Sequence, residues 1–224
     1  MPALALLSGG LDSTVAAALY KARHGAVALG LVVDYGQRAA GRELEAAQAV
    51  GRALGFDVIA TGLPLLAEIT GTALVRRDRP LPAPDPARLD AAAAAAASAD
   101  AVWVPNRNGL LVNLAAALAE ARGLDTVIVG FNAEEGATFP DNTAAFVEHC
   151  NACLRDSTRG RVAVACPTLA MTKTELLAAG LAMGAPVHLA WSCYEGGPAP
   201  CGRCESCRRR ERAEREQRSR VPRP

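Results

Sequence analysis

Four cysteines near the carboxyl end are the first residues whose type and spacing indicate chemistry. Cys193, Cys201, Cys204 and Cys207 follow the pattern C-x₇-C-x₂-C-x₂-C, and the glycines and prolines between them bend the backbone so that the sulfurs can converge. Four converging thiolates form the closed tetrahedral site typical of structural Zn²⁺. An iron–sulfur cluster is the alternative, because it also uses four cysteines at short spacings. Since nothing else in the chain indicates electron transfer, we expect zinc.

The other three cysteines show no such pattern. Cys150 and Cys153 stand three residues apart on a predicted helix, so we interpret them as buried thiols, with metal ligands as the alternative. Cys166 precedes a proline at the end of a predicted strand and is assigned to the core. The chain begins without the pattern of a signal peptide, and its first apolar run is too short for a membrane span. We therefore expect a cytoplasmic protein whose thiols stay reduced and bind metal.

A glycine-containing loop near the amino end offers a second chemistry. In "ALALLSGGLDSTVAAALYK" a buried strand is followed by a turn and a helix. Gly9 and Gly10 let backbone N–H groups approach a ligand, and Asp12 or Ser13 can cap the helix, whose positive end then faces an anion. This arrangement favours phosphate, although a capped turn without a ligand would explain the two glycines equally well. A Walker A loop is excluded because its Lys-Ser/Thr ending is absent.

Apolar runs alternate along the chain with longer segments rich in Ala, Leu and Glu, which predicts strands alternating with helices. The predicted strands are Ala3–Leu7, Val27–Val33, Asp57–Ala60, Thr126–Gly130 and Val162–Cys166. The predicted helices are Asp12–Arg23, Arg42–Leu54, Asn108–Arg122 and Thr172–Met183. Because the strand runs lack polar alternation, they suit strands covered on both faces. We expect an α/β fold with a doubly wound, mostly parallel, Rossmann-like sheet.

Length and charge limit the number of domains and the kinds of partner to expect. Its 224 residues fit one core, and 24 basic against 23 acidic residues leave a net charge of +1, which argues against nucleic acid or a membrane as partner. We expect an α/β domain over 1–190, a Cys₄ zinc-binding region over 191–210 and a charged, partly disordered tail over 211–224. The Pro- and Ala-rich stretch 76–100 is interpreted as a surface insertion, a solvated loop or weak helix, with a lid as the alternative. The tail is interpreted as a solvated helix, with a nucleic-acid-binding arm as the alternative.

Further motifs link the loop to the cysteines. The hexapeptide Ser8–Ser13 resembles the pyrophosphate loop of the N-type ATP pyrophosphatases. Over nearly its whole length the chain resembles one family of that superfamily, the 7-cyano-7-deazaguanine synthases. The motifs that carry this resemblance are "DYGQR" at 34–38, "VPNRN" at 104–108, "GFNAEEGATFPDN" at 130–142, "FVEHCN" at 146–151, "TKTE" at 172–175 and "WSCY" at 191–194.

The resemblance implies both a fold and a reaction. The fold would be that of the adenine nucleotide alpha hydrolases, with the cysteines holding a structural Zn²⁺. The reaction would convert 7-carboxy-7-deazaguanine and ammonia into the nitrile, as in queuosine-type biosynthesis, with ATP activating first the carboxylate and then the amide. Mg²⁺ would accompany ATP, and the protein would be a homodimer.

The resemblance also implies roles for particular residues. The catalytic residues would be Asp12, which would hold Mg²⁺, Arg107, which can meet a phosphate or a carboxylate, and Lys173, which would neutralise departing phosphate. ATP would be bound by Leu7, Ser8, Gly9, Gly10, Leu11, Asp12, Ser13, Thr14, Tyr35, Gln37 and Lys173. The carboxylate substrate would be bound by Arg107, Asn108, Asn132, Phe139 and Asp141.

The chain departs from the family pattern close to the expected substrate. Asn142 and Thr143 stand where the family has Cys-Arg, and Ala39 stands where it has His. An adenylating enzyme for a different carboxylate is therefore an alternative. A tRNA-thiolating enzyme of the same fold is another, although the near-neutral charge and the commitment of four cysteines to one cluster disfavour it. A zinc-containing nucleotide-binding protein without catalysis is a third, disfavoured by the intact Asp12, Arg107 and Lys173.

Overall fold

Five parallel strands form one sheet in the computed structural model, which describes residues 2–220. The strands are β1 (Ala3–Leu6), β2 (Leu29–Asp34), β3 (Asp57–Gly62), β4 (Thr126–Ile128) and β5 (Ala163–Ala165). Their order across the sheet is β3-β2-β1-β4-β5, and every neighbouring pair is parallel. The chain thus winds outward in one direction from β1 and then in the other, which confirms the doubly wound α/β fold.

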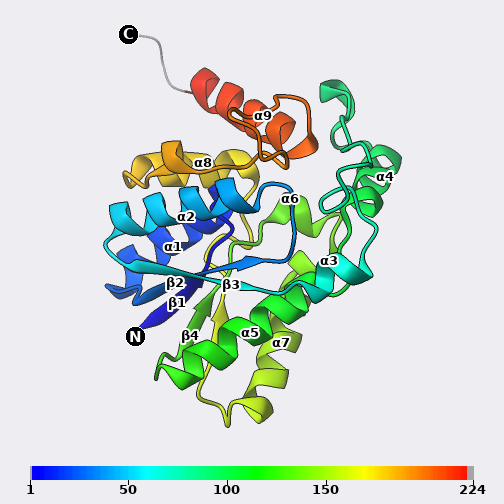
Figure 1. Cartoon of the computed structure of the whole chain (residues 1–224). Coiled ribbons are helices and arrows are strands. Elements are labelled where there is room, and N and C mark those ends of the chain that lie inside the picture. Colours follow the sequence, from blue (N-terminus) through cyan, green and yellow to red (C-terminus); the bar gives the residue numbers. More distant parts are fainter. Residues whose placement is uncertain (1, 221–224) are drawn as a thin grey trace.

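Helices cover both faces of the sheet (Figure 1). On one face lie α1 (Leu11–His24) and α2 (Ala40–Leu54), with α8 (Lys173–Ala182) packed beside α1; on the other lie α5 (Arg107–Ala121) and α7 (Ala144–Ser157). Alternate residues of β1 belong to different cores, because Ala3 and Ala5 pack with the α1 side and Leu4 with the α5 side. Burial of both faces explains the continuous apolar runs in the sequence.

The strand β3 is less buried than its sequence predicts. It pairs only with β2 and forms one edge of the sheet, and most of its residues are half-buried or exposed. Short helical pieces that the sequence does not predict connect the main elements. These are α3 (Leu65–Ile69), η1 (Pro86–Arg88), α6 (Ala133–Gly136), η2 (Pro140–Asn142) and η3 (Val187–Leu189).

The insertion 76–100 is mostly exposed, as interpreted from the sequence, but four of its residues are buried against the rest of the protein. It contains most of α4 (Ala92–Val102), whose residues Ala95 and Ala99 are buried, and Leu89 before it is buried as well. Ser98 donates a hydrogen bond to Glu205 at the start of α9 (Glu205–Arg220). A helix without apolar periodicity is thus held by neighbouring elements and not by its own propensity.

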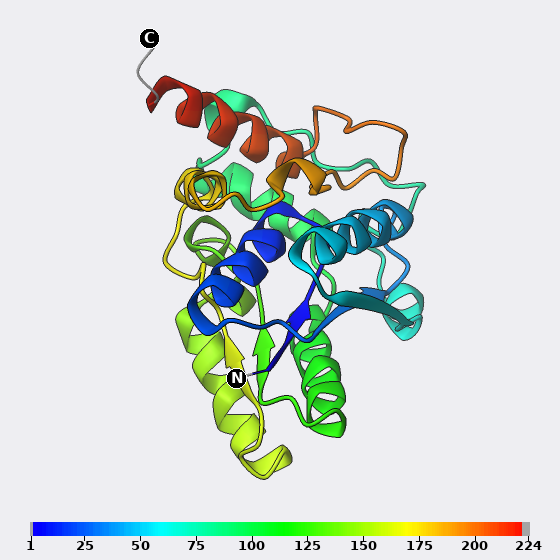
Figure 2. The ribbon, with the colours of Figure 1, turned by 90° about the vertical axis from the view of Figure 1, so that its left-hand side faces the viewer.

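The charged tail forms a helix as predicted, but α9 is not solvated on all sides. It packs on α8, Ala213 is completely buried, and Thr174 of α8 donates a hydrogen bond of 2.7 Å to Glu216 (Figure 2). Residues 221–224, where disorder was expected, lie outside the described residues. Within residues 2–220, no helix is both long and apolar enough to cross a membrane.

The three cysteines outside the cluster differ in exposure. Cys150 and Cys166 are half-buried and pack against the core between the sheet and helices α5 and α7, consistent with a structural role. Cys153 is exposed, so its interpretation as a buried thiol is wrong. It lies one turn further along α7, which buries only part of its surface against the sheet.

Candidate active site and metal centre

The glycine loop lies where the winding of the sheet reverses. β1 ends at Leu6, α1 begins at Leu11, and the neighbours of β1 on its two sides are β2 and β4. Crevices at the carboxyl ends of strands beside such a reversal are the usual ligand sites of open α/β sheets. Gly9 has φ +68°, and a Cβ there would lie 2.3 Å from the carbonyl oxygen of Glu43. Only glycine fits this position, and the close packing against α2 fixes the path of the loop.

Hydroxyl groups hold the loop in shape. The N–H of Ser8 donates to Oγ of Ser13 at 3.3 Å, and Oγ of Thr14 donates to the carbonyl oxygen of Gly10 at 2.8 Å. Gly10 is the N-cap of α1 and has no side chain with which to cap it, so the prediction that Asp12 or Ser13 caps the helix is wrong. Both residues lie inside the first turn, whose positive end is a ready anion site.

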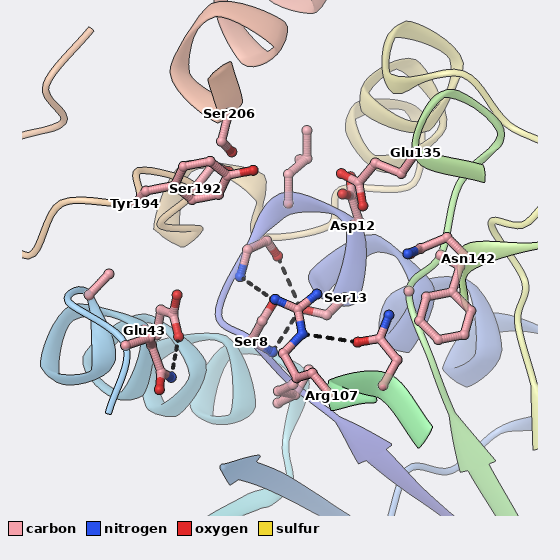
Figure 3. Close-up of a pocket in the computed structure, with 18 of the residues that line it drawn as sticks. Ser8, Asp12, Ser13, Glu43, Arg107, Glu135, Asn142, Ser192, Tyr194 and Ser206 are labelled. Carbon is pink, nitrogen blue, oxygen red and sulfur yellow. Dashed lines mark hydrogen bonds between the residues drawn. The ribbon is translucent and has the colours of Figure 1, made fainter. Parts of the chain in front are cut away.

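A buried charge cluster lies beside the loop. The ammonium group of Lys173, the first residue of α8, donates to Oδ2 of Asp12 and to Oε1 of Glu135, the latter at 3.1 Å. Nδ2 of Asn132 also donates to Oδ2 of Asp12, at 3.2 Å, while its Oδ1 accepts from the N–H of Glu135 at 3.0 Å. Figure 3 shows the carboxylates of Asp12 and Glu135 next to each other above the loop. Asn132, at the start of α6, therefore contacts both residues whose carboxylates bind Lys173: it holds Glu135 through the backbone N–H of that residue and Asp12 through its side chain.

Burial and charge act in opposite directions on these groups. Burial raises the pKa of Asp12 from 3.8 to about 6, although Lys173 opposes the shift. Burial also favours the neutral form of Lys173, but the carboxylates of Asp12 and Glu135 outweigh it and raise the pKa of the lysine. Burial tends to raise the pKa of Glu135, but Lys173 outweighs it and the pKa is lowered. Near neutral pH the cluster thus contains an ammonium between two carboxylates.

The opposite wall combines the end of β2 with the start of α5. Arg107 donates to the hydroxyl of Tyr35 at 3.3 Å, and its guanidinium carbon lies 5.9 Å from the centre of the Tyr35 ring. Gln37 accepts from the N–H of Tyr35 at 2.9 Å and donates to Glu43 at 2.8 Å. Burial raises the pKa of Tyr35, with Arg107 opposing. Arg107 thus presents a fixed cation to the pocket, suited to a phosphate or a carboxylate.

These walls enclose a cavity of about 240 Å³, lined by residues from both ends of the chain (Figure 3). The predicted site residues among those that line it are Leu7, Ser8, Gly10, Leu11, Asp12, Ser13, Tyr35, Gln37, Arg107, Asn108, Phe139 and Lys173. The structure therefore brings most of the predicted site into one place.

Four predicted residues lie behind this lining. Gly9 and Thr14 shape the loop and the first turn of α1, and Asn132 is completely buried against Asp12. The side-chain amide of Asn108 donates to the backbone carbonyl oxygen of Asp141 at 3.3 Å, so Asp141 supports Asn108 from behind. These four residues contact lining residues from outside the cavity.

The four predicted metal ligands come together in the structure. The Sγ atoms of Cys193, Cys201, Cys204 and Cys207 all lie within 4.8 Å of one another. Backbone N–H groups donate to two of them: Glu195 and Cys201 to Cys193, and Cys204 to Cys201, each at 3.3 Å. Such bonds stabilise thiolates, so the group could hold a metal ion.

Comparison with known proteins places this architecture in a family. The model of the family described as "Queuosine biosynthesis protein QueC" matches residues 2–218. The chain belongs to the QueC family. This confirms the resemblance that the loop, the internal motifs and the cysteine spacing indicate.

Curated relatives of this QueC-family chain carry one name. A protein named 7-cyano-7-deazaguanine synthase from Pelotomaculum thermopropionicum is 48% identical over 213 residues, covering 95% of this chain and 96% of the relative. One of the same name from Methanosarcina mazei is 43% identical over 216 residues, covering 95% and 93%. Among solved structures, the U34-tRNA thiolase NcsA from Methanococcus maripaludis with its 4Fe-4S cluster has a TM-score of 0.49 and 14% identity, covering 99% of this chain and 74% of that chain.

Several residues of the cavity carry no predicted role. They include Glu43, Glu135, Trp191, Ser192, Tyr194, Glu205, Ser206 and Arg209. Glu205 and Ser206 lie between two cysteines of the cluster, and Trp191 and Tyr194 flank the first. Their proximity in sequence to the four cysteines could have indicated their place in the cavity. If the cysteine cluster packs against the sheet edge, the residues next to it in the chain lie there as well.

Proposed function

We propose that this protein uses ATP to convert 7-carboxy-7-deazaguanine and ammonia into 7-cyano-7-deazaguanine. The observation that carries the proposal is the single cavity that joins the loop Leu7–Ser13, the Lys173–Asp12–Glu135 cluster and Arg107. Membership of the QueC family and the name shared by its curated relatives support the choice of substrate. Ammonia as nitrogen donor, a homodimer and a cytoplasmic location are parts of the same proposal that rest on family membership.

The loop is the proposed site of the ATP phosphates. The positive end of α1 and the N–H groups of the turn suit the β- and γ-phosphates, which leave as pyrophosphate. Lys173 supplies a cation at the loop, and its two carboxylate partners hold it in place before ATP binds. Leu7, Tyr35 and Gln37 line the same cavity and complete the proposed nucleotide site, with Gly9 and Thr14 supporting it.

Asp12 fits a role in holding Mg²⁺. Its Oδ2 is occupied by Lys173 and Asn132, while its Oδ1 is buried and has no hydrogen-bond partner among residues 2–220. A buried carboxylate oxygen without a partner is costly unless a ligand completes it. Mg²⁺ is commonly held by one or two carboxylates together with substrate phosphates, and it would offset phosphate charge at this point.

Arg107 is the proposed partner of the substrate carboxylate. Its guanidinium can donate to two carboxylate oxygens side by side, and its anchoring on Tyr35 restricts its motion. Asn108 and Phe139 line the cavity next to it, with Asn132 and Asp141 behind them, and together they form the proposed substrate side. The aromatic ring of Phe139 suits the flat face of a deazapurine.

The reaction needs two activations at one site. Attack of the carboxylate on the α-phosphate of ATP releases pyrophosphate and leaves an acyl adenylate, and ammonia then displaces AMP to give the amide. The amide oxygen attacks the α-phosphate of a second ATP and pyrophosphate leaves again; loss of AMP, which carries away the oxygen, and of both amide protons gives the nitrile. The residues described here would align the reactants and stabilise the phosphate charge that develops in both rounds.

The cysteine cluster is proposed to hold a structural Zn²⁺. A tetrahedral zinc with Zn–S bonds of about 2.3 Å places its sulfurs about 3.8 Å apart. The 4.0 Å between the Sγ atoms of Cys201 and Cys207 fits such a site, whereas an iron–sulfur cube inserts several atoms between its ligands. We propose that this ion holds residues 191–210 together as one region, between the α/β domain 1–190 and the charged tail that begins at residue 211.

The test is turnover of purified protein with ATP, Mg²⁺, ammonium and 7-carboxy-7-deazaguanine, with nitrile, amide and AMP followed by mass spectrometry. We expect nitrile, with two AMP formed per nitrile, in the wild type, and a loss of at least about 100-fold in Lys173→Met. AMP or amide without nitrile would show an adenylating enzyme with a different end product. Absence of any substrate consumption by zinc-loaded protein would overturn the proposal.

A further inference from the structure

Arg209 is a buried arginine that no predicted role explains. It lies on α9, two residues after the metal ligand Cys207, and lines the cavity with only 7% of its surface exposed. Its guanidinium contacts the carboxylates of Asp90 at 3.1 Å, Glu134 at 3.4 Å and Glu205 at 2.9 Å. A guanidinium placed among several carboxylates can neutralise groups that would otherwise repel one another.

Glu134 connects this arginine to the catalytic lysine. Its Oε2 faces Arg209 and also accepts from Arg212 at 2.5 Å, while its Oε1 accepts the backbone N–H of Lys173 at 2.9 Å. The next residue, Glu135, accepts from the side chain of the same lysine. Two consecutive glutamates thus hold Lys173, one by its backbone and one by its ammonium group.

We propose that Arg209 is a positioning residue for Lys173. By holding Glu134 it fixes the start of α8, and this keeps the ammonium group of Lys173 beside the loop. This inference rests on the proposed function for its catalytic consequence. It also links the cysteine cluster to the reaction, because Cys204 and Cys207 lie just before Arg209 on the same stretch of chain.

The start of α8 explains why the contact matters. The first N–H groups of a helix have no partner within it. In α8, Thr172 accepts from Glu175 and Glu134 accepts from Lys173, the first helical residue. If Glu134 loses Arg209, it keeps Arg212, which is less buried and already contacts the same oxygen. Held from that side alone, its carboxylate can shift, and the backbone of Lys173 then loses its anchor. Small displacements of this kind can cost about 100-fold in rate.

The experiment compares Arg209→Gln and Glu134→Gln, alone and combined, with Arg209→Lys and the control Arg210→Gln. Arg210 is the next residue of α9, but it donates to the carbonyls of Ala190 and Val187 and pairs with Glu214, outside the cavity. Metal content, melting temperature, KM for ATP and kcat are measured for each variant.

We expect Arg209→Gln and Glu134→Gln each to lower kcat by about 10- to 100-fold, with little change in KM for ATP. The double variant should be no slower than the slower single variant, because the two residues act through one contact. Arg209→Lys should regain part of the rate, and Arg210→Gln should retain it. Effects that multiply in the double variant, or a loss confined to KM, would overturn the proposal.

A second readout needs no turnover and so separates this inference from the proposed function. The chain has two lysines, Lys21 and Lys173. Their labelling by an amine-reactive reagent can be followed by mass spectrometry in one sample, with Lys21 as the internal reference. Lys173 should label slowly in the wild type and in Arg210→Gln, and several-fold faster in Arg209→Gln and Glu134→Gln. Equal labelling of Lys173 in all variants would contradict the positioning role even if the proposed reaction were confirmed.

Discussion

The two ends of the chain reach the same cavity by different physical means. The loop Leu7–Ser13 is a short continuous segment, and its shape is set by one left-handed glycine, a few hydroxyl contacts and the strand and helix on either side. The region 191–209 has little regular structure before α9 and is drawn together by four sulfurs from separate positions. One wall of the site depends on backbone conformation and the other on the convergence of four cysteines, for which we propose a bound metal.

Because of this difference, the two regions should respond differently to loss of metal. The loop lies between buried elements of the sheet core, so its position follows from the fold of the whole domain. The cysteine region contacts the core at a few points, such as the hydrogen bond of 2.8 Å from the N–H of Trp191 to the carbonyl oxygen of Gly9. We therefore expect metal loss to remove one wall of the cavity while the other persists.

The largest effect is expected for Cys204→Ser. Structural zinc sites contribute on the order of 10 kcal/mol of binding free energy, and a buried hydroxyl in place of the thiolate forfeits much of it. We expect loss of bound metal, protease sensitivity over 191–220 and loss of activity, with the circular dichroism of the α/β domain largely kept. Metal content and limited proteolysis are the measurements.

Cys153→Ser is the matched control, because Cys153 is exposed and lies outside the cluster. It should keep its metal and its activity. A Cys204→Ser protein that retained full zinc and full turnover would contradict the comparison drawn here.

The next effect concerns the loop, tested by Gly9→Ala. The new Cβ would lie 2.3 Å from the carbonyl oxygen of Glu43, in a backbone conformation with φ +68°. Gly25→Ala is the control, because its φ is +86° but nothing lies within 4 Å of its Cβ position. We expect a loss of about 1 kcal/mol at Gly25 and about 3 kcal/mol at Gly9, measured by denaturant unfolding. Only Gly9→Ala should weaken ATP binding, and equal losses in the two variants would show that strain alone matters.

Much of the fold and of the loop could be predicted because the relevant signals are local. The buried strands and their helices appear as continuous apolar runs and Ala-rich segments, and a glycine in the left-handed conformation follows both α1 and α2, at Gly25 and Gly55. The cysteine cluster was predicted from spacing alone, because few arrangements other than a metal site bring four thiols so close.

The rest depends on contacts between distant segments that spacing does not reveal. Glu134 and Arg209 are far apart in the chain, and nothing in either local sequence shows that they meet. The insertion could not be placed for the same reason, since α4 is held by Ser98 contacting Glu205 and by the buried Leu89. Capping of α1 was predicted wrongly because the turn at Gly10 starts the helix earlier than the polar residues suggest.

The charge cluster beside the loop should give a pH dependence of stability in ligand-free protein. The pKa of Asp12 is raised from 3.8 to about 6 by burial, so the folded state binds more protons than the unfolded state between these values. The free energy of unfolding therefore receives a contribution that is present at low pH and is lost as pH rises through about 6.

The variant Asp12→Asn isolates this contribution, because it cannot titrate. Between about pH 5 and about pH 7 the wild type should lose on the order of 1 kcal/mol more stability than the variant. Urea unfolding at several pH values, without nucleotide or Mg²⁺, is the measurement. Parallel pH profiles for the two proteins would show that the Asp12 carboxyl does not carry the raised pKa.

The smallest effect sharpens the comparison most, because it separates the stability of the protein from the positioning of Lys173 on the loop side of the cavity. Thr172 caps α8 in a reciprocal arrangement with Glu175, and Thr143 caps α7 by accepting from the N–H of Phe146. Replacing either threonine by alanine should cost about 1 kcal/mol of stability. Thr172→Ala also loosens the turn that carries Lys173, so it should lower kcat several-fold, whereas Thr143→Ala should lower only the melting temperature. If the two variants lost activity equally, the Thr172 cap would contribute to turnover only through stability. The placement of Lys173 would then depend on its ion pairs with Asp12 and Glu135 and on the contact of Glu134 with its backbone.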